Sequence, residues 1–174
     1  MNPRSPAPGF PTLARLGFTY DVELVRRGRV VDRERVHNLV PTEGLNLILS
    51  ILFKGTSVPA AWYIGIFEGN YTPVAGDTMA SFPGSATECT AYDESTREVF
   101  TAGTVAGGAV NNAASLAEFT LSAEKTIYGA FMSTVATKEA TSGSLISAAK
   151  FASPKGGEDG DVLRVTAGFT ITSA

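Results

Sequence analysis

The stretch from Glu88 to Phe100, ECTAYDESTREVF, holds the densest group of chemically reactive side chains in the sequence. It combines carboxylates with a thiol, a phenol and a guanidinium. These residue types support three interpretations: nucleophilic catalysis by a cysteine, a metal site, or a polar segment that fastens a sheet. The rest of the sequence favours the third.

Catalysis by Cys89 would require a thiolate and a nearby base. The only histidine, His37, lies far away in the sequence, in a segment rich in arginine. Glu88, Asp93 and Glu94 place negative charge around the thiol, and such charge raises a thiol pKa and disfavours the thiolate. We therefore predict no catalytic residue here and expect Cys89 to be a small buried side chain.

Metal and cofactor sites have equally weak signals. One cysteine and one histidine cannot form a structural zinc site. The acidic segment GGEDGD, residues 156–161, lacks the spacing of an EF-hand and is typical of a hairpin turn. The glycines of TAGTVAGGAV are not followed by the Lys-Ser/Thr pair of a phosphate-binding loop. We expect no metal, no cofactor and no enzymatic activity.

The third interpretation assigns these side chains a structural role. Arg97 is close enough in sequence to form a bidentate pair with Glu88 or Asp93. Tyr92 is expected to bury its ring while its hydroxyl stays paired. An irregular segment needs such links because its backbone has no ladder partners. We predict a structural brace made of Glu88, Tyr92, Asp93 and Arg97.

The composition of the 174-residue chain indicates an all-β protein. It contains 18 glycines and 9 prolines, and only 18% of its residues are charged, against about 25% in typical domains. Short strands recur at roughly ten-residue spacing and are broken by Gly and Asn turns. In DVLRVTAGFTIT, residues 161–172, apolar residues nearly alternate with polar or small ones. We predict a β-sandwich or jelly-roll-like domain with one short helix.

Three segments follow from the patterns along the chain. Residues 1–17 are proline-rich and predict an extended arm. Residues 18–40 alternate around Arg27-Gly28 and predict a basic β-hairpin. Residues 41–174 predict the sandwich, with a helix near 43–54 that Thr42 caps. Its apolar face is formed by Leu45, Ile48, Leu49 and Leu52.

Charge is concentrated near the N-terminus, although the chain as a whole carries a net charge of −3. Residues 1–40 contain seven arginines and four carboxylates, so this part is basic on an acidic body. We interpret it as a segment that docks on an acidic neighbour, such as a second copy. The docking residues expected are Arg4, Phe10, Leu13, Arg15, Arg26, Arg27 and Arg29. The overall charge argues against nucleic-acid binding, and no apolar run is long enough for a signal peptide or a membrane span.

The order of segments resembles that of small accessory structural proteins of tailed-bacteriophage virions, of the head-decoration or tail-component type. The resemblance covers about residues 38–174. It rests on NLVPTEGLNLIL, WYIGIFEG, ATECTAYDESTREVF, AEFTLSAEKTIYGAFMST, GSLISAAKF and GDVLRVTAGFTIT. The most specific pieces are the Glu88…Tyr92…Arg97 module and the Tyr128–Phe131 strand.

The resemblance implies a protein of the virion, assembled in the host cytoplasm, that acts as a capsid decoration (cement) protein. The implied partners are the major capsid protein or tail proteins and other copies of the chain, in an oligomer within the particle. A tail adaptor, tail-tip or fibre-attachment protein is the alternative. A third interpretation is recognition of host glycans by an aromatic platform of Trp62, Tyr63, Phe67 and Tyr71.

Overall fold

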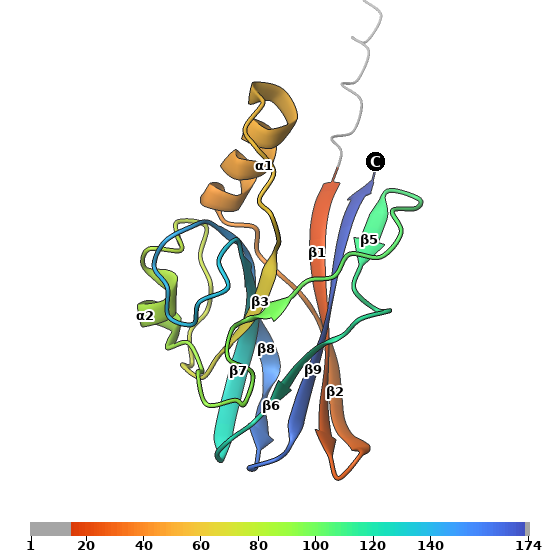
Figure 1. The fold of residues 1–174 in the computed structure, drawn as a ribbon, viewed down its shortest axis with the longest axis vertical. Coiled ribbons are helices and arrows are strands. Elements are labelled where there is room, and N and C mark those ends of the chain that lie inside the picture. The colour runs from red at the N-terminus through yellow and green to blue at the C-terminus, as the bar shows by residue number, and fades with distance from the viewer. Residues whose placement is uncertain (1–14, 173–174) are drawn as a thin grey trace, which may run out of the picture.

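The computed structural model describes residues 15–172, which form two antiparallel β-sheets and two helices (Figure 1). The prediction of an all-β sandwich is confirmed. The elements are β1 (Arg15–Arg26), β2 (Arg29–His37), α1 (Thr42–Lys54), β3 (Tyr63–Phe67), α2 (Phe82–Ala86), β4 (Glu98–Val99), β5 (Ala109–Asn111), β6 (Ala117–Thr120), β7 (Lys125–Ser133), β8 (Leu145–Gly157) and β9 (Val162–Thr172).

The first sheet, sheet A, has the order β2-β1-β9, with β5 and β6 both paired to the free side of β9. The second, sheet B, has the order β4-β3-β7-β8. Strand β1 pairs with β9 from Arg15↔Thr172 to Val25↔Val162. The hairpin is therefore a central part of sheet A and not a separate unit, and residues 15–17, expected in the arm, belong to the sheet.

Alternation along the strands builds the core between the sheets. Tyr20, Val22 and Leu24 point inward from β1, as period-two patterning predicts. They pack in one cluster with Ile64 and Ile66 of β3. The buried hydroxyl of Tyr20 also hydrogen-bonds with the Ser147 hydroxyl of β8 at 2.7 Å, so one polar contact crosses from sheet A to sheet B.

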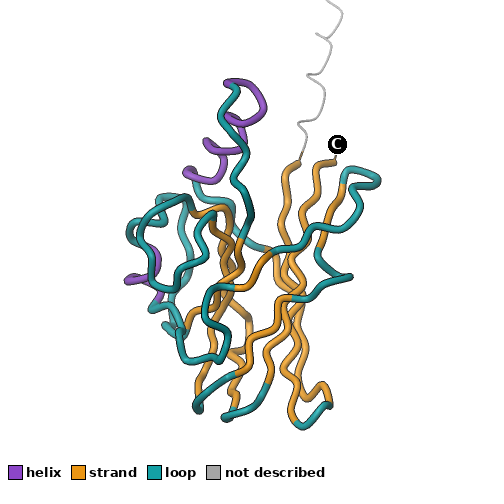
Figure 2. The backbone as a smooth tube through the Cα atoms, in the orientation of Figure 1, coloured by secondary structure: helices purple, strands orange, loops and turns teal. Residues whose placement is uncertain are grey.

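Sheet B is buried on both faces, which explains why WYIGIF reads as a continuous apolar run. Its outer face carries a second cluster under the loops around α2 (Figure 2). Here two glycines lie beneath aromatic rings of the opposite strand. Phe131 covers its cross-strand partner Gly65, and Phe67 covers Gly129. A Cβ at Gly129 would lie 2.1 Å from the Phe67 ring, so the Tyr128–Phe131 motif is a packing requirement.

Helix α1 differs from the prediction in two respects. It begins after Pro41, and Thr42 makes no capping hydrogen bond. Its apolar residues Leu45, Leu49 and Leu52 are exposed rather than covered. The N-terminal turn instead anchors the helix: the Glu43 carboxylate accepts hydrogen bonds from the backbone N–H groups of Met79 (2.8 Å) and Leu145 (2.7 Å). A second helix, α2, is present in addition to the one short helix that was predicted.

Charged side chains close the edge where β2 meets β8. Lys155 has a side chain only 1% exposed and lies 3.0 Å from Asp32 and 2.9 Å from Glu34. The Glu34 carboxylate also accepts hydrogen bonds from the N–H groups of Ala152 and Ser153. A buried ammonium ion requires such pairing, so these contacts hold the two sheets together along this edge.

A further ion pair closes the far end of the hairpin. The single Nε–H of Arg26 donates a bifurcated hydrogen bond to both oxygens of the Asp161 carboxylate, at 2.9 and 3.1 Å, and a terminal nitrogen donates to Oδ2 at 2.7 Å. The Asp161 carboxylate also accepts from the Glu158 N–H at 2.8 Å. The contact with Arg26, helped by that backbone N–H, lowers the pKa of Asp161 below its ordinary value. The predicted acidic turn is therefore organised by an arginine of the hairpin.

This pair predicts a stability that depends on pH. Because the folded pKa is the lower one, the Asp161 contribution is complete above the unfolded-state pKa, about 4, and is lost as pH falls through the folded value. In urea unfolding, Asp161→Asn should be less stable than wild type at pH 5–7, and the difference should shrink below about pH 4. Asp93→Asn, at an exposed carboxylate, is the control. A difference independent of pH would contradict the assignment.

Candidate functional site

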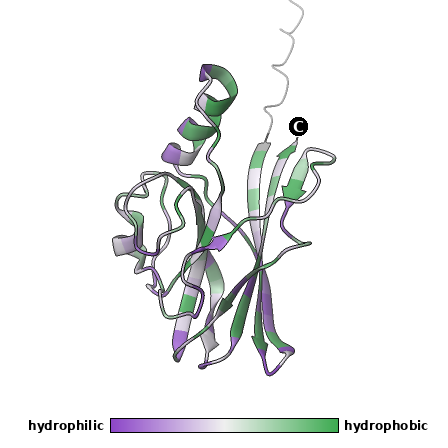
Figure 3. Ribbon diagram, viewed as in Figure 1, coloured by the Kyte–Doolittle hydropathy of each residue, from purple (hydrophilic) through white to green (hydrophobic). Residues whose placement is uncertain are grey.

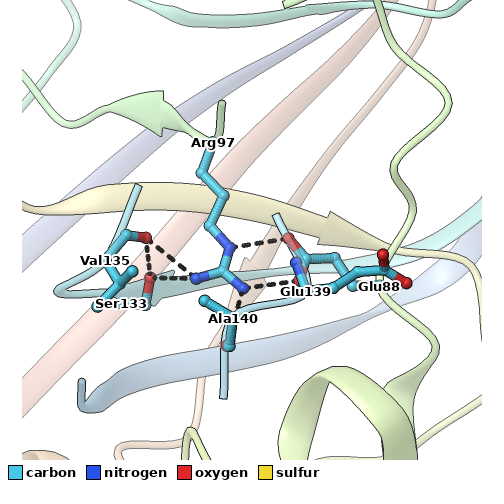
Figure 4. A network of polar contacts seen from close by, with 6 residues as sticks. All are labelled: Glu88, Arg97, Ser133, Val135, Glu139 and Ala140. Carbon is cyan, nitrogen blue, oxygen red and sulfur yellow. Dashed lines mark hydrogen bonds and ion pairs between the residues drawn. The ribbon is translucent and has the colours of Figure 1, made fainter. Parts of the chain in front are cut away.

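The most ordered polar cluster lies at the segment with the densest chemistry in the sequence (Figure 4). Arg97 and Glu88 form a bidentate pair, with Nε donating to Oε1 at 2.8 Å and a terminal nitrogen donating to Oε2 at 2.7 Å. Both side chains are 0% exposed. This geometry is the strong form of an arginine–carboxylate contact.

The remaining guanidinium donors point at the loop between β7 and β8. The second terminal nitrogen of Arg97 donates to the Ser133 hydroxyl at 3.2 Å and to the Val135 carbonyl at 3.0 Å. The nitrogen that pairs with Glu88 also donates to the Ala140 carbonyl at 3.4 Å. All five N–H groups of the guanidinium thus have a partner among the described residues, and the ring of Phe131 lies 5.1 Å away.

Both oxygens of the Glu88 carboxylate accept hydrogen bonds. Its Oε2 atom accepts a backbone hydrogen bond from Glu139 at 2.8 Å in addition to the bond from Arg97. Glu88 itself is held by a bridge to Phe67 of β3 and by its N–H, which donates to the Pro83 carbonyl. The pair therefore joins three segments: the crossing after α2, the residue before β4, and the β7–β8 loop.

Tyr92 and Asp93, the other two residues of the predicted brace, lie outside this network. The Tyr92 ring packs edge-on against Phe119 at 5.1 Å, and its hydroxyl has no partner within the described part of the chain, in contrast to the prediction. Burial raises the pKa of this phenol. Asp93 is exposed and contributes a backbone bond to Thr120. Its neighbour Glu94 makes the side-chain contact instead, accepting from the Thr120 N–H.

Lys138 links the β7–β8 loop to the segment around Tyr92, a contact that the sequence did not indicate. Its ammonium group lies 3.5 Å from the centre of the Tyr92 ring and donates to the carbonyls of Thr90 and Tyr92 at 3.1 and 3.0 Å. Burial lowers its pKa. An ammonium over an aromatic face is a favourable contact. No spacing rule connects positions 92 and 138, because only the fold brings the β7–β8 loop over this segment.

The candidate nucleophile is not activated in the structure. Cys89 is fully buried, and burial raises the pKa of its thiol. It hydrogen-bonds through its backbone to Ile66 of sheet B, whereas His37 is exposed and pairs with Thr19 in sheet A. Within residues 15–172, no group of three or more His, Cys, Asp or Glu side chains is arranged to hold a metal ion.

The remaining predicted sites are distributed as follows. Arg4, Phe10 and Leu13 lie outside the described residues, and Arg15 is the first residue of β1. Arg26 is engaged by Asp161 within its own chain. Arg27 and Arg29 are exposed beside the hairpin turn and form no ion pair with any described residue. The docking role assigned to these residues stays a prediction.

The aromatic residues of the glycan hypothesis do not share a surface. Phe67 is fully buried in the outer cluster of sheet B, and Tyr71 packs against that cluster with its hydroxyl donating to Asp77 at 2.7 Å. Trp62 lines an apolar groove beside α1. Tyr63 is half-buried in β3. The four rings therefore do not form one exposed platform, and glycan recognition stays a prediction.

Comparisons with protein-family models and with curated proteins find no match to this chain. Among the described residues, no helix has the length and apolar character required to cross a membrane. The chemistry of the site therefore rests on its geometry. Every donor of the Arg97 guanidinium is occupied within the described residues, and the Glu88 carboxylate is held by the ion pair and by a backbone N–H.

Removing one partner of this pair should destabilise the fold strongly. Arg97→Ala leaves the Glu88 carboxylate buried without its counter-ion, so we expect the free energy of unfolding to fall by about 3–5 kcal/mol. Arg97→Lys keeps the charge but loses the fork geometry, so its free energy of unfolding should lie between those of wild type and Arg97→Ala. Chemical unfolding followed by circular dichroism measures both.

Arg164→Ala provides the matched control, because Arg164 pairs with Glu118 at 2.7 Å while both side chains remain partly exposed. Its loss should cost no more than about 1 kcal/mol. Equal effects of Arg97→Ala and Arg164→Ala would contradict the proposed importance of the buried pair.

Proposed function

We propose that this chain is a structural protein of a tailed-bacteriophage virion, acting as a capsid decoration protein that joins neighbouring subunits by surface contact. The observation that carries the proposal is the exposed apolar side of α1. Leu52 and Phe53 are 63% and 79% exposed there. Most of the stability of a short helix comes from packing of its apolar face against other residues. Because part of the apolar face of α1 is uncovered, this surface fits a protein that packs against a neighbour in an assembly.

The distribution of charge supports the same conclusion. Buried cations are paired internally, as Arg97 with Glu88 and Lys155 with Asp32 and Glu34. Arg27 and Arg29, which form no ion pair with any described residue, lie together beside the exposed hairpin turn at the opposite end of the molecule from α1 (Figure 1). Such a pair fits an acidic neighbouring surface. The proposed partners are the major capsid protein and other copies of this chain.

A tail adaptor, tail-tip or fibre-attachment protein is the second candidate, because an exposed apolar end also suits a ring of identical subunits. Copy number separates the two. Quantitative mass spectrometry of purified virions should give on the order of hundreds of copies for a decoration protein and on the order of 3–12 for a tail ring. Absence of the chain from purified particles would overturn both.

The N-terminal segment provides a more specific test of the docking role. Removing residues 1–14 leaves every described strand intact, so we expect an unchanged melting curve. Incorporation into particles, measured by competition with the full chain, should fall because the arm contacts are lost. Arg27→Glu together with Arg29→Glu should reduce incorporation in the same way. Normal incorporation of both variants would contradict docking through the basic N-terminal part.

A further inference from the structure

An apolar groove of about 280 Å³ opens beside α1, where the two sheets diverge. Aromatic side chains from four separate segments line it: Phe18, Trp62, Phe100 and Phe169. Ile51 and Leu52 of α1 form part of its wall. Figure 3 shows hydrophobic residues along most of α1 and at the neighbouring ends of β9 and β5. The groove is open to solvent at its mouth.

Helix α1 is anchored at one end only, which leaves this surface uncovered. Gly44 packs so closely on β8 that a Cβ would lie 2.5 Å from the Ile146 carbonyl oxygen. Glu43 adds the two hydrogen bonds to Met79 and Leu145. Towards the C-terminal end, Leu49, Leu52 and Phe53 are 53%, 63% and 79% exposed, whereas Ile51 is half-buried. Of these three, Leu52 lines the groove, so an occupant of the groove would bury it.

The chemistry of the groove fits a proline-rich strand. Aromatic-lined grooves bind polyproline II segments, because each proline ring packs on an aromatic face and the segment is already extended. Proline also lacks an N–H, so fewer donors lose their water when it enters an apolar site. The chain carries such a segment at residues 3–13, which contain Pro3, Pro6, Pro8 and Pro11.

This segment joins the fold at the mouth of the groove. The first described residue, Arg15, begins β1, and its neighbour Leu16 pairs with Ile171, which lines the groove. The segment would span roughly 30 Å as polyproline II. Between Phe10 and Arg15 the only strong turn former is Pro11, and proline also fixes φ at the value of an extended polyproline II segment. This argues for delivery of Phe10 and Leu13 away from the molecule that carries them.

We propose that the groove of each copy receives residues 3–13 of a second copy, with Phe10 and Leu13 as the apolar anchors. The contact is head-to-tail, so repetition of it generates a ring or an open array of copies. The inference deepens the proposed function, on which it rests for the expectation that copies assemble.

Trp62 makes the proposal directly measurable, because it is the only tryptophan and lies in the groove. In the full chain, we expect Trp62 to become less accessible to acrylamide as protein concentration rises. This protection should parallel the appearance of dimers and larger species in analytical ultracentrifugation. Protection that is complete in monomers at every concentration would place the segment in its own groove and overturn the exchange between copies.

Variants on both sides of the contact test the identity of the occupant. Phe10→Asp should weaken association at least about tenfold, because a charge enters an apolar site. Ser5→Asp, which adds the same charge to the same segment, should have a smaller effect. On the receiving side Leu52→Asp should match Phe10→Asp. Val31→Asp, at an exposed valine of β2, is its control.

Mixing the two defective variants provides the decisive measurement. The Phe10→Asp copy retains a working groove and the Leu52→Asp copy retains a working segment, so together they should form a one-to-one complex that does not grow. If association is lost in Leu52→Asp but kept in Phe10→Asp, the groove binds another surface and the proposal is wrong. No association in the full chain would also overturn it. Neither result depends on whether the chain occurs in virions, so the proposed function is tested separately.

Discussion

The fold depends on one buried ion pair more than on any other polar contact. Moving a guanidinium and a carboxylate out of water costs several kcal/mol per ion, and the Arg97–Glu88 pair offsets this cost only because every donor of Arg97 finds an acceptor. The same contacts hold the long crossing after β3 and the β7–β8 loop over the outer face of sheet B. Phe67 and Phe131 remain covered there as a consequence.

This outer cover makes the sandwich unequal on its two sides. Sheet B packs against sheet A on one face and against loops and α2 on the other. At the β2–β8 edge, Lys155 and Glu34 close the sandwich with charged contacts. At the α1 end the sheets diverge, and the core aromatics Phe18 and Phe169 reach an open groove. Charged contacts therefore join the two sheets at one edge, while the accessible surface at the α1 end is apolar.

That division connects the structure with the proposed role. Carboxylates and cations that pair inside a protein hold the segments that carry them in fixed positions. An exposed apolar groove is a liability for an isolated chain, but it is useful where many identical copies meet. The proline-rich N-terminal segment and the groove supply complementary chemistry within a single sequence.

The sequence predicted much of the fold from local patterns. Period-two alternation located β1 and β9, and Arg27-Gly28 marked the hairpin turn, where both residues have positive φ. The helix near 43–54 was also found. The exposure of its apolar residues was not predicted, because periodicity reveals an apolar face but not whether other residues cover that face. The second helix, α2, was missed because FPGSA has no helical periodicity.

At the candidate site, too, the sequence predicted the kind of contact but not all of the residues that make it. The acidic and basic residues around position 90 indicated a bidentate clamp, and Glu88 and Arg97 were two possible members. The choice of Glu88 over Asp93, the contribution of Ser133 and the position of Lys138 above Tyr92 could not be read from the chain. Local sequence by itself determined which groups needed partners, since a buried charge must be paired. Tertiary structure alone decided which partners they have, because residues distant in the chain become neighbours only when the two sheets pack.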